Sequence, residues 1–539
     1  MSVPSHNTLE LGPLPLATIE WRAVLGPERV STDEHALQKA QNTTFASPHH
    51  VRAILFPNDV QQVQECLRIA SRHRIPIYPV STGKNWGYTS SAPTSDAVLL
   101  NLSQMNRILD FSEELGYVTI EPGVTQGQLY EFLKSRNSRL WIDPTGASPE
   151  CSLLGNIVER GFGHTRYSDH FAHSCNFEVV LPDGQVIHTG HGDLPGCKTA
   201  PLCRWGTGPF ADGVFSQSNF GVVTRLTLWL MPAPECVEAF FFRIDHEDDL
   251  PHVVDALRPL RMGGTLQSAC HIGNNYKVLS GLQAYPWDAT GGQTPLMPDA
   301  LAPLAKKFNF GAWNGSGALY GTKRQVAEAR RLVKCALAGK ASKLRFLDER
   351  RLIIASRFAG ITRLFNSWDL NRALELVRPL FGLIQGVPSA QFIKSCYWRK
   401  RTFDENNMDP DRDRCGLIWC SPLSPLKGAE VRQMSDICIS TVLQHGFEPM
   451  ISLTLLTERT VGCVVSIIYD RDVPGEDERA KVCHEQLLQR LLASGYYPYR
   501  LGIQSMPVMQ HAGPFGQFLR RLKNELDPEH ILAPGRYEA

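Results

Sequence analysis

Residues 53–93 read AILFPNDVQQVQECLRIASRHRIPIYPVSTGKNWGYTSSAP. The short apolar run at the start predicts a strand, and the apolar residues that follow at three-to-four spacing predict a helix. The run IYPV predicts a second strand, which leads into a loop of glycines and small hydroxyl residues from Ser81 to Ser91. Such a loop lets backbone N–H groups approach a phosphate group closely. Its spacing matches neither the dinucleotide pattern G-x-G-x-x-G nor the P-loop, so neither of those two sites is predicted.

Strands and helices continue to alternate through the first 235 residues. DAVLLNLSQMNRILDF and GYVTIEPGV predict one further strand each, and TQGQLYEFLKSRN predicts a helix capped by Thr125. FEVVLPDGQVIHTG predicts a hairpin with a two-residue turn at Asp183-Gly184, and SNFGVVTRLTLWLMPAP adds further strands. The cluster Met231-Pro232-Ala233-Pro234 interrupts this pattern and predicts a domain boundary.

The remainder of the chain predicts a second α+β domain. Residues 236–495 combine long amphipathic helices, such as KRQVAEARRLVKCAL, with strands such as ISLTLLT and GCVVSIIYD. The final segment, FGQFLRRLKNELDPEHILAPGRYEA, predicts a helix that ends at Asp527-Pro528, followed by a tail that returns to the first domain. A chain of 539 residues is too long for one hydrophobic core, which agrees with two domains.

Composition argues against several classes of function. Lys and Arg number 55 and Asp and Glu 54, so no overall positive field attracts nucleic acid or an anionic membrane. No run of about 18 apolar residues predicts a membrane span, and the first thirty residues lack the pattern of a signal peptide. The fourteen cysteines are dilute and irregularly spaced, as buried free thiols are, which favours a cytoplasmic location. Neither His170 with His173 nor Cys197 with Cys203 matches zinc-ligand spacing, so no metal is expected.

Seven segments in a fixed order resemble one family of flavoproteins. They are PVSTGKNWGY, EPGVTQGQLYEFL, SLLGNIVERGFGHTRYSDH, FEVVLPDGQVIHTG, FSQSNFGVVTRLTLWLMP, GYYPYR and LDPEHILAPGR. Together they resemble the vanillyl-alcohol oxidase and p-cresol methylhydroxylase family, to which eugenol oxidase belongs. The resemblance implies an α+β protein of two domains, in which residues 1–235 and 496–539 bind FAD and residues 236–495 form a cap domain over the isoalloxazine ring.

The same resemblance implies which residues contact the cofactor. The histidine to which some members attach FAD falls near Leu417, where no histidine lies close, and Asn85 stands where other branches have an attaching histidine. Cys415, Cys420 and Tyr397 are nearby nucleophiles, but we expect them in the core, and we therefore predict non-covalent FAD. The residues implied to contact FAD are Pro79, Ser81, Thr82, Gly83, Lys84, Asn85, Gly87, Tyr88, Gly155, Asn156, Gly161, Gly163, Asn219, Val222 and Arg500.

Three residues match the substrate-binding group of the family: Tyr88, Tyr499 and Arg500. Two tyrosine hydroxyls and a permanently charged guanidinium can donate hydrogen bonds to a phenolic oxygen and favour phenolate over phenol. The resemblance then implies hydride transfer from the para benzylic carbon to flavin N5, which leaves a quinone methide. The expected substrate is a para-substituted phenol or a 4-hydroxybenzylic alcohol, with oxygen or another acceptor reoxidising the flavin.

The sequence departs from the family at the position of an active-site acid. Family oxidases place an aspartate near flavin N5, and here Ala147 falls at that position. Asp143 or Glu150 from a shifted loop, or Ser148, are alternatives at the same place. His164 replaces a tyrosine of the family and is a candidate base near neutral pH, with a structural role as the alternative.

These departures leave other functions open. One is oxidation of a different alcohol, a hydroxy acid or a secondary metabolite by the same cofactor. Another is a catalytically impaired flavoprotein that serves as a binding or assembly subunit. The family resemblance implies a homodimer or a larger homo-oligomer, although a single sequence reveals no interface.

Overall fold

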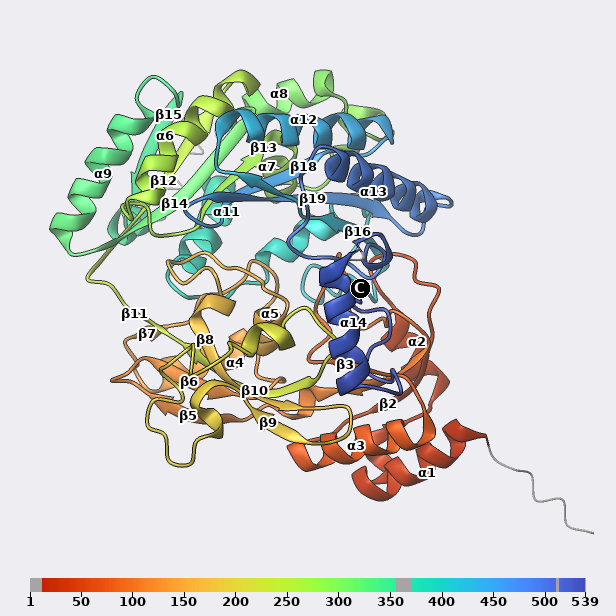
Figure 1. Ribbon diagram of the computed structural model, residues 1–539. Coiled ribbons are helices and arrows are strands. Elements are labelled where there is room, and N and C mark those ends of the chain that lie inside the picture. Colours follow the sequence, from red (N-terminus) through yellow and green to blue (C-terminus); the bar gives the residue numbers. More distant parts are fainter. Residues whose placement is uncertain (1–11, 355–369, 510–512, 539) are drawn as a thin grey trace, which may run out of the picture.

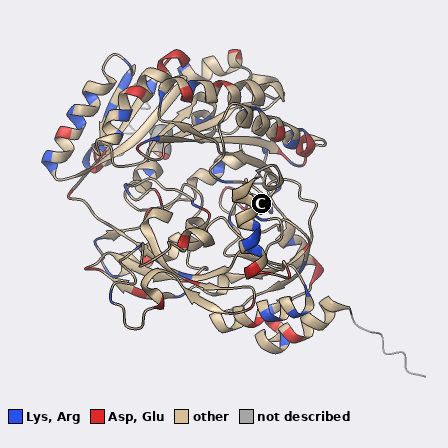
Figure 2. Ribbon diagram, in the orientation of Figure 1, with Lys and Arg blue, Asp and Glu red and all other residues tan. Residues whose placement is uncertain are grey.

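Two bodies of secondary structure lie one above the other and are joined by extended segments (Figure 1). The computed structural model describes residues 12–354, 370–509 and 513–538. The upper body in Figure 1 contains the long sheet that starts at β12 (Cys236–Ile244). The lower body contains the preceding chain together with the last helix, and the domain limits given above stay predictions. Lys and Arg are interspersed with Asp and Glu over both bodies (Figure 2).

Residues 53–93 and the segments beside them form a small sheet, and the glycine-rich loop begins at its edge. Its elements are α1 (Pro13–Leu25), β1 (Val30–Ser31), α2 (Glu34–Gln41), β2 (Val51–Leu55), α3 (Val60–His73), β3 (Ile77–Val80) and β4 (Ala97–Asn101). Strands β2, β4 and β3 are parallel, and β1 pairs antiparallel with β2. The carboxylate of Asp59 caps α3 by accepting a hydrogen bond from Gln62 N. The apolar face of α3 packs with α1 in the core of this sheet, and the loop from Ser81 begins where β3 ends.

A five-stranded antiparallel sheet, in the order β5-β6-β10-β8-β9, forms the rest of the lower body. Its strands and the elements beside it are β5 (Ile108–Ser112), β6 (Tyr117–Ile120), α4 (Gln126–Ser135), β7 (Leu140–Trp141), α5 (Leu153–Val158), β8 (Ser174–Val180), β9 (Val186–His188), β10 (Val222–Trp229) and β11 (Met231–Pro232). Thr125 caps α4 as predicted, because its Oγ1 accepts a hydrogen bond from Gln128 N.

Two local predictions for this region were wrong. The segment DAVLLNLSQMNRILDF is not one strand, because the side chain of Asn101 accepts a hydrogen bond from Ser103 N and ends β4, while β5 joins the other sheet. The hairpin between β8 and β9 has a three-residue loop, since Leu181 N donates to Gln185 O at 2.8 Å. Gly184 takes the left-handed position of that loop, with φ of +83°.

The upper body is built on an eight-stranded sheet whose main path runs β15-β12-β14-β13-β18-β19-β16, with β17 paired to β19. Helices α6, α9, α12 and α13 pack on one face of this sheet and form with it the largest apolar core (Figure 1). The opposite face looks toward the lower body. The elements are α6 (Leu250–Met262), β13 (Cys270–Asn274), α7 (Asn275–Leu282), α8 (Pro298–Phe308), β14 (Trp313–Gly321), α9 (Lys323–Leu337), β15 (Lys343–Leu347), α11 (Leu370–Leu383), β16 (Cys415–Cys420), β17 (Leu423–Pro425), α12 (Gly428–Gln444), β18 (Met450–Leu455), β19 (Thr460–Asp470) and α13 (Glu476–Ala493).

The C-terminal segment returns to the lower body. Helix α14 (Pro514–Leu526) ends before Asp527, and the chain beyond it runs beside β3. Ile77 N donates to Ile531 O at 2.8 Å, and Ala533 N donates to Ile77 O at 2.8 Å. Residues of the tail thereby extend the sheet that carries the glycine-rich loop.

None of the helices in the described ranges is both long and apolar enough to cross a membrane.

Candidate active site

A cavity of about 450 Å³ lies between the two bodies and is walled by residues from both. The lower body contributes the loop after β3 and α5, and the upper body contributes the free face of its sheet. Alternate strand residues face the cavity, among them Ser452 and Thr454 on β18, because successive side chains of a strand point to opposite sides. Leu453, between them, points into the core beneath the helices.

The wall at the glycine-rich loop fits a long cofactor with phosphate groups. Gly83 has φ of +70°, a left-handed conformation that favours glycine. A Cβ at Gly155 would lie 2.3 Å from Ser81 Oγ, so a larger residue would close this part of the cradle. The arrangement is suited to FAD, whose diphosphate the loop backbone would hold. Most residues predicted to contact FAD line the cavity: Pro79, Ser81, Thr82, Gly83, Lys84, Asn85, Tyr88, Gly155, Asn156, Gly161, Val222 and Arg500.

Three residues predicted to contact FAD lie outside the cavity wall. Gly87 has φ of +79°, and a Cβ there would lie 2.9 Å from the ring of Trp419. A Cβ at Gly163 would lie 2.1 Å from Asp143 Oδ1. The amide of Asn219 donates to Ala533 O at 3.1 Å and so anchors the C-terminal tail. The structure gives these three residues packing or anchoring positions.

Tyr88, Tyr499 and Arg500 meet at one part of the cavity, named here the arginine end. The guanidinium carbon of Arg500 lies 4.5 Å from the centre of the Tyr88 ring, and its Nη2 donates to Asn85 Oδ1 at 2.7 Å. The hydroxyl of Tyr88 lies 2.6 Å from Ser421 Oγ. The backbone N of Tyr499 donates to Ser421 O at 3.1 Å. Loops from both bodies therefore hold this group together.

Burial raises the pKa of both tyrosines at the arginine end. For Tyr88, the charge of Arg500 and hydrogen bonds with Ser421 and Tyr499 oppose this rise in pKa without reversing it. The pKa of Tyr499 lies well above its ordinary value. Both hydroxyls therefore stay protonated near neutral pH and are able to donate hydrogen bonds to an anionic oxygen.

A carboxylate that sequence reasoning missed fixes the orientation of Arg500. Glu159 Oε2 lies 3.3 Å from Arg500 Nε, and Glu159 Oε1 forms an ion pair with Arg536. The hydroxyl of Tyr537 donates to Glu159 Oε2 at 3.2 Å. Glu159 is only 7% exposed, so its charge is balanced by these neighbours and hardly by water. In the sequence, Glu159 stands out only as an acidic residue directly after the apolar run LLGNIV.

Another part of the cavity, named here the histidine end, contains His164, His271 and Lys277. The two imidazole rings are 4.4 Å apart between centroids, and His271 Nδ1 lies 3.0 Å from Thr454 Oγ1. Burial lowers the pKa of His164 to about 4 and that of His271 well below its ordinary value, so both are neutral at pH 7. Sequence reasoning missed His271 and Lys277, because no motif marks them.

At the position of the missing aspartate, the described cavity wall presents no carboxylate, since Glu159, which also lines the cavity, contacts Arg500 at the arginine end. Ala147 lines the cavity at this point. Asp143 Oδ1 instead accepts a hydrogen bond from His164 N at 2.7 Å, behind the wall, and Glu150 is exposed at the surface. Ser148 Oγ accepts a hydrogen bond from Glu150 N at 3.2 Å and does not line the cavity either. The structure therefore places none of the three alternatives, Asp143, Glu150 and Ser148, on the cavity wall.

The nucleophiles considered for covalent attachment also lie away from the cavity. Leu417 is buried, with 1% of its surface exposed, and Cys415 and Cys420 are buried on either side of it. The hydroxyl of Tyr397 donates to Asp413 Oδ2 at 2.5 Å. None of these four residues belongs to the cavity wall. Non-covalent FAD stays a prediction.

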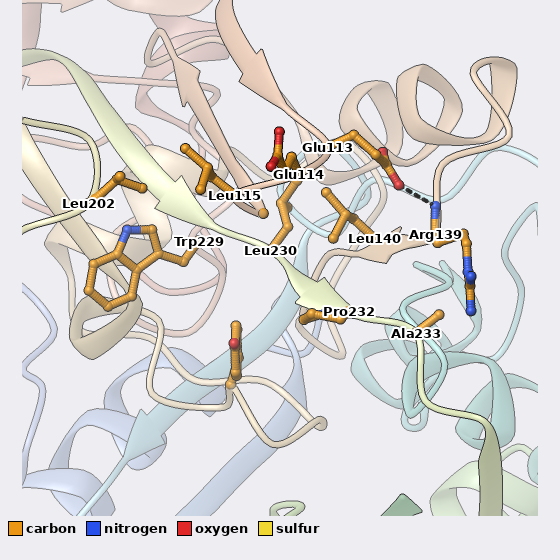
Figure 3. Close-up of a pocket in the computed structure, with 12 residues that line it drawn as sticks. Glu113, Glu114, Leu115, Arg139, Leu140, Leu202, Trp229, Leu230, Pro232 and Ala233 are labelled. Atoms are coloured by element: carbon orange, nitrogen blue, oxygen red, sulfur yellow. Dashed lines mark hydrogen bonds between the residues drawn. The ribbon is translucent and has the colours of Figure 1, made fainter. Parts of the chain in front are cut away.

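A second cavity, of about 580 Å³, lies beside the β5–β6 hairpin (Figure 3). Its wall is mostly apolar, with Glu113 accepting a hydrogen bond from Arg139 N at 2.8 Å. None of the predicted site residues lines this cavity, so we assign the candidate site to the first one. Within the described parts of the chain, no group of three or more His, Cys, Asp or Glu residues is arranged to hold a metal ion.

Comparison with known proteins agrees with this geometry. Residues 51–190 match the family model described as FAD binding domain. The chain is 44% identical to 1'-carboxy-chondrochloren decarboxylase of Chondromyces crocatus, over 98% of this chain and 97% of that protein. It is 32% identical to the 4-cresol dehydrogenase [hydroxylating] flavoprotein subunit of Pseudomonas putida, over 96% and 94%.

Solved structures show the same fold along nearly the whole chain. A structure of p-cresol methylhydroxylase with substrate bound superposes with a TM-score of 0.87 at 30% identity, covering 98% of each chain. A 4-ethylphenol oxidase from Gulosibacter chungangensis, in an isoeugenol complex, gives a TM-score of 0.88 at 27% identity, covering 100% of this chain and 99% of that one. The predicted α+β flavoprotein fold is thus confirmed, and the chain belongs to the vanillyl-alcohol oxidase and p-cresol methylhydroxylase family of FAD-dependent oxidoreductases.

Proposed function

We propose that this protein oxidises a para-substituted phenol, or a 4-hydroxybenzylic alcohol, at the benzylic carbon. The observation that carries the proposal is the arginine end, where two protonated tyrosine hydroxyls and a fixed guanidinium converge. Such a group stabilises an anionic oxygen at a defined point. Names of related proteins, 4-cresol dehydrogenase and 4-ethylphenol oxidase, agree with a phenolic substrate.

The residues at the arginine end would act on the phenolic oxygen. Tyr88 and Tyr499 donate hydrogen bonds to it, and Arg500, held by Glu159 and Asn85, supplies the positive charge. Together they lower the pKa of the phenol and bind it as phenolate. Bound FAD supplies a hydride acceptor at N5. The phenolate donates electron density into its ring as the benzylic C–H bond gives up its hydride, and the substrate becomes a neutral quinone methide.

The fate of the quinone methide depends on the histidine end. Addition of water requires a group that accepts a proton, and Ala147 supplies none. The neutral histidines are weak bases, because burial lowers the pKa of His164 to about 4. Water addition is therefore poorly supported by the residues near this position.

A second candidate function, oxidative decarboxylation, needs no such base. If the carbon next to the benzylic carbon carries a carboxylate, its C–CO₂⁻ bond breaks and its electron pair forms the new C=C bond. The ring becomes aromatic again, CO₂ leaves, and the products are an alkenyl phenolate and reduced flavin. Ala147 favours this route, and the related protein of Chondromyces crocatus is named a decarboxylase.

The visible spectrum of the purified holoenzyme tests the proposal. The spectrum is recorded without oxygen before and after addition of 4-hydroxybenzyl alcohol or 4-propylphenol, and again after admission of air. We expect rapid bleaching of the flavin band by at least one phenol. The rate of recovery in air then distinguishes an oxidase from a dehydrogenase that uses another acceptor.

The other outcomes identify the alternatives. A flavin that no phenol bleaches, but that another alcohol or a hydroxy acid does, would show that the cofactor serves a different substrate. Stoichiometric FAD that no compound reduces would favour a catalytically impaired subunit. Either result overturns phenol oxidation as the function.

A further inference from the structure

Lys277 stands at the histidine end with its side chain over the free face of the sheet. It lies in the first turn of α7, where Asn274 Oδ1 caps the helix by accepting a hydrogen bond from Lys277 N at 3.0 Å. A side chain at Gly273 on β13 would contact the lysine stem, with Cβ 3.6 Å from Lys277 Cγ. The lysine stem therefore passes close to Gly273, and Lys277 lines the cavity.

Lys277 differs from the other cations of the cavity wall, because none of the described residues supplies it with a counter-ion. Lys84 Nζ lies 3.1 Å from Asp409 Oδ2, and Arg500 and Arg536 share the carboxylate of Glu159. Among the residues that the structure describes, Lys277 Nζ forms neither an ion pair nor a hydrogen bond. Burial lowers the pKa of Lys277, opposed only by the nearby thiol of Cys396. Burial of an unpaired ammonium raises the free energy of the folded protein, and an anion bound in the cavity would lower it again.

The strand order of the sheet gives an estimate of the distance between β13, beside Lys277, and the arginine end. Trp419 on β16 packs edge-on against Tyr88, with ring centroids 5.2 Å apart, and marks the arginine end. From β16 the strands follow in the order β19, β18 and β13, so β13 lies three strand spacings away, or about 14 Å. A lysine stem directed toward β16 would shorten that gap, and the remaining span would then suit a phenol with a short side chain that ends in an anionic group.

We propose that Lys277 binds a carboxylate on the substrate, so that the substrate class is a phenol with a carboxyl-bearing para side chain. The inference rests on the proposed function, since the arginine end must hold the phenolic oxygen. It deepens that function by assigning the second anchor. Within the histidine end, His164 and His271 are neutral at pH 7, so the ammonium of Lys277 is the group there that would attract the carboxylate.

Two substrates of matched shape test Lys277. The acid 3-(4-hydroxyphenyl)propanoate carries a carboxylate where 4-propylphenol carries a methyl group. Anaerobic flavin reduction is measured with both, for the wild-type holoenzyme and for Lys277→Met, and 4-vinylphenol and CO₂ are assayed as products of the acid. We expect the ratio of kcat/KM for the acid to that for 4-propylphenol to fall at least about 30-fold in Lys277→Met. Lys277→Arg, which keeps the charge, should retain most of the ratio.

A binding measurement supplies a readout independent of turnover. 3-Phenylpropanoate lacks the hydroxyl that drives oxidation, and its Kd is obtained from the perturbed flavin spectrum and from the rise in Tm. We expect Lys277→Met to weaken this binding at least about 30-fold. An unchanged selectivity ratio together with an unchanged Kd would overturn the assignment of Lys277. If no phenol bleaches wild-type flavin, the proposed function fails, and the Kd comparison still decides whether Lys277 binds a carboxylate.

Discussion

The two ends of the cavity differ in how their cationic side chains are paired with carboxylates. At the arginine end, Arg500 forms an ion pair with Glu159 and donates a hydrogen bond from Nη2 to Asn85, although its Nε has no hydrogen-bond partner among the described residues. At the histidine end, His271 Nε2 is buried without a hydrogen-bond partner in the described structure, and the charge of Lys277 is unpaired. A paired group is preorganised for one task, whereas unpaired buried groups indicate that a ligand completes them. From this difference we infer that the proposed binding of the phenolic oxygen and the proposed choice of side chain belong to different parts of one cavity.

The strongest test of the arginine end is Arg500→Lys. An ammonium cannot reproduce the planar guanidinium that contacts Asn85 and Glu159 together, so phenolate stabilisation is lost. We expect kcat/KM for phenol-dependent flavin reduction to fall about 100- to 1,000-fold. Arg520→Lys, on the exposed side of α14, serves as the control for the same substitution. Unchanged kcat/KM in Arg500→Lys would show that the arginine end does not stabilise the phenolate through the guanidinium of Arg500.

Glu159→Gln tests whether the arginine end depends on the ion pairs between Glu159 and the two guanidinium groups. The amide keeps the size of the carboxylate but leaves Arg500 and Arg536 without their shared negative charge. We expect the free energy of unfolding to fall by about 3 kcal/mol, because a buried charge loses its partner. Denaturant unfolding of the holoenzyme measures this change. A variant as stable as the wild type would indicate that water or FAD balances these guanidinium groups.

The pH dependence of stability tests the histidine end. Burial lowers the pKa of His164 from 6.5 to about 4, so between these pH values the unfolded chain binds a proton that the folded protein does not. The corresponding stability is present above pH 6.5 and is lost as the pH falls toward 4, by about 1.4 kcal/mol per pH unit. In His164→Asn, the loss of stability between pH 6 and pH 5 should be smaller by about this amount. Urea unfolding at both pH values measures it, and equal losses in variant and wild type would contradict it.

Ser421→Ala should have the smallest effect. Tyr88 loses the hydroxyl 2.6 Å from its own, but Arg500 still lies over its ring. One hydrogen bond in such a network contributes about 1 kcal/mol, so we expect KM for a phenol to rise about fivefold with little change in Tm. Steady-state kinetics and thermal unfolding check both parts. A change in kcat/KM as large as that of Arg500→Lys would mean that the paired groups act as one unit.

Much of the lower body could be predicted because its local signals agree with one another. Helix α3 combines a capping Asp59 with apolar residues at helical spacing, and α4 has a capping Thr125. The error at β4 and β5 arose because an apolar run does not reveal that Asn101 turns the chain into another sheet. The arginine end could be found because Tyr88, Tyr499 and Arg500 lie in segments that resemble the family.

The histidine end could not be predicted, because the protonation of its side chains depends on how deeply the fold buries them. Lys277 lies in a short amphipathic helix, where a lysine normally reaches solvent. Only the fold places it over Gly273 and inside the cavity. In the same way, the low pKa of His164 follows from burial by both bodies, which no spacing of residues along the chain reveals.

The C-terminal tail is synthesised after the other segments that surround the glycine-rich loop and Glu159. Every strand of the three main sheets lies before residue 471, so a nascent chain can form them early. Arg536 and Tyr537, which complete the surroundings of Glu159, leave the ribosome later, and so do Ile531 and Ala533, which pair with Ile77 beside the glycine-rich loop. A partly made chain therefore has an unfinished cradle and an unbalanced Glu159, and we expect tight FAD capture to follow release of the tail.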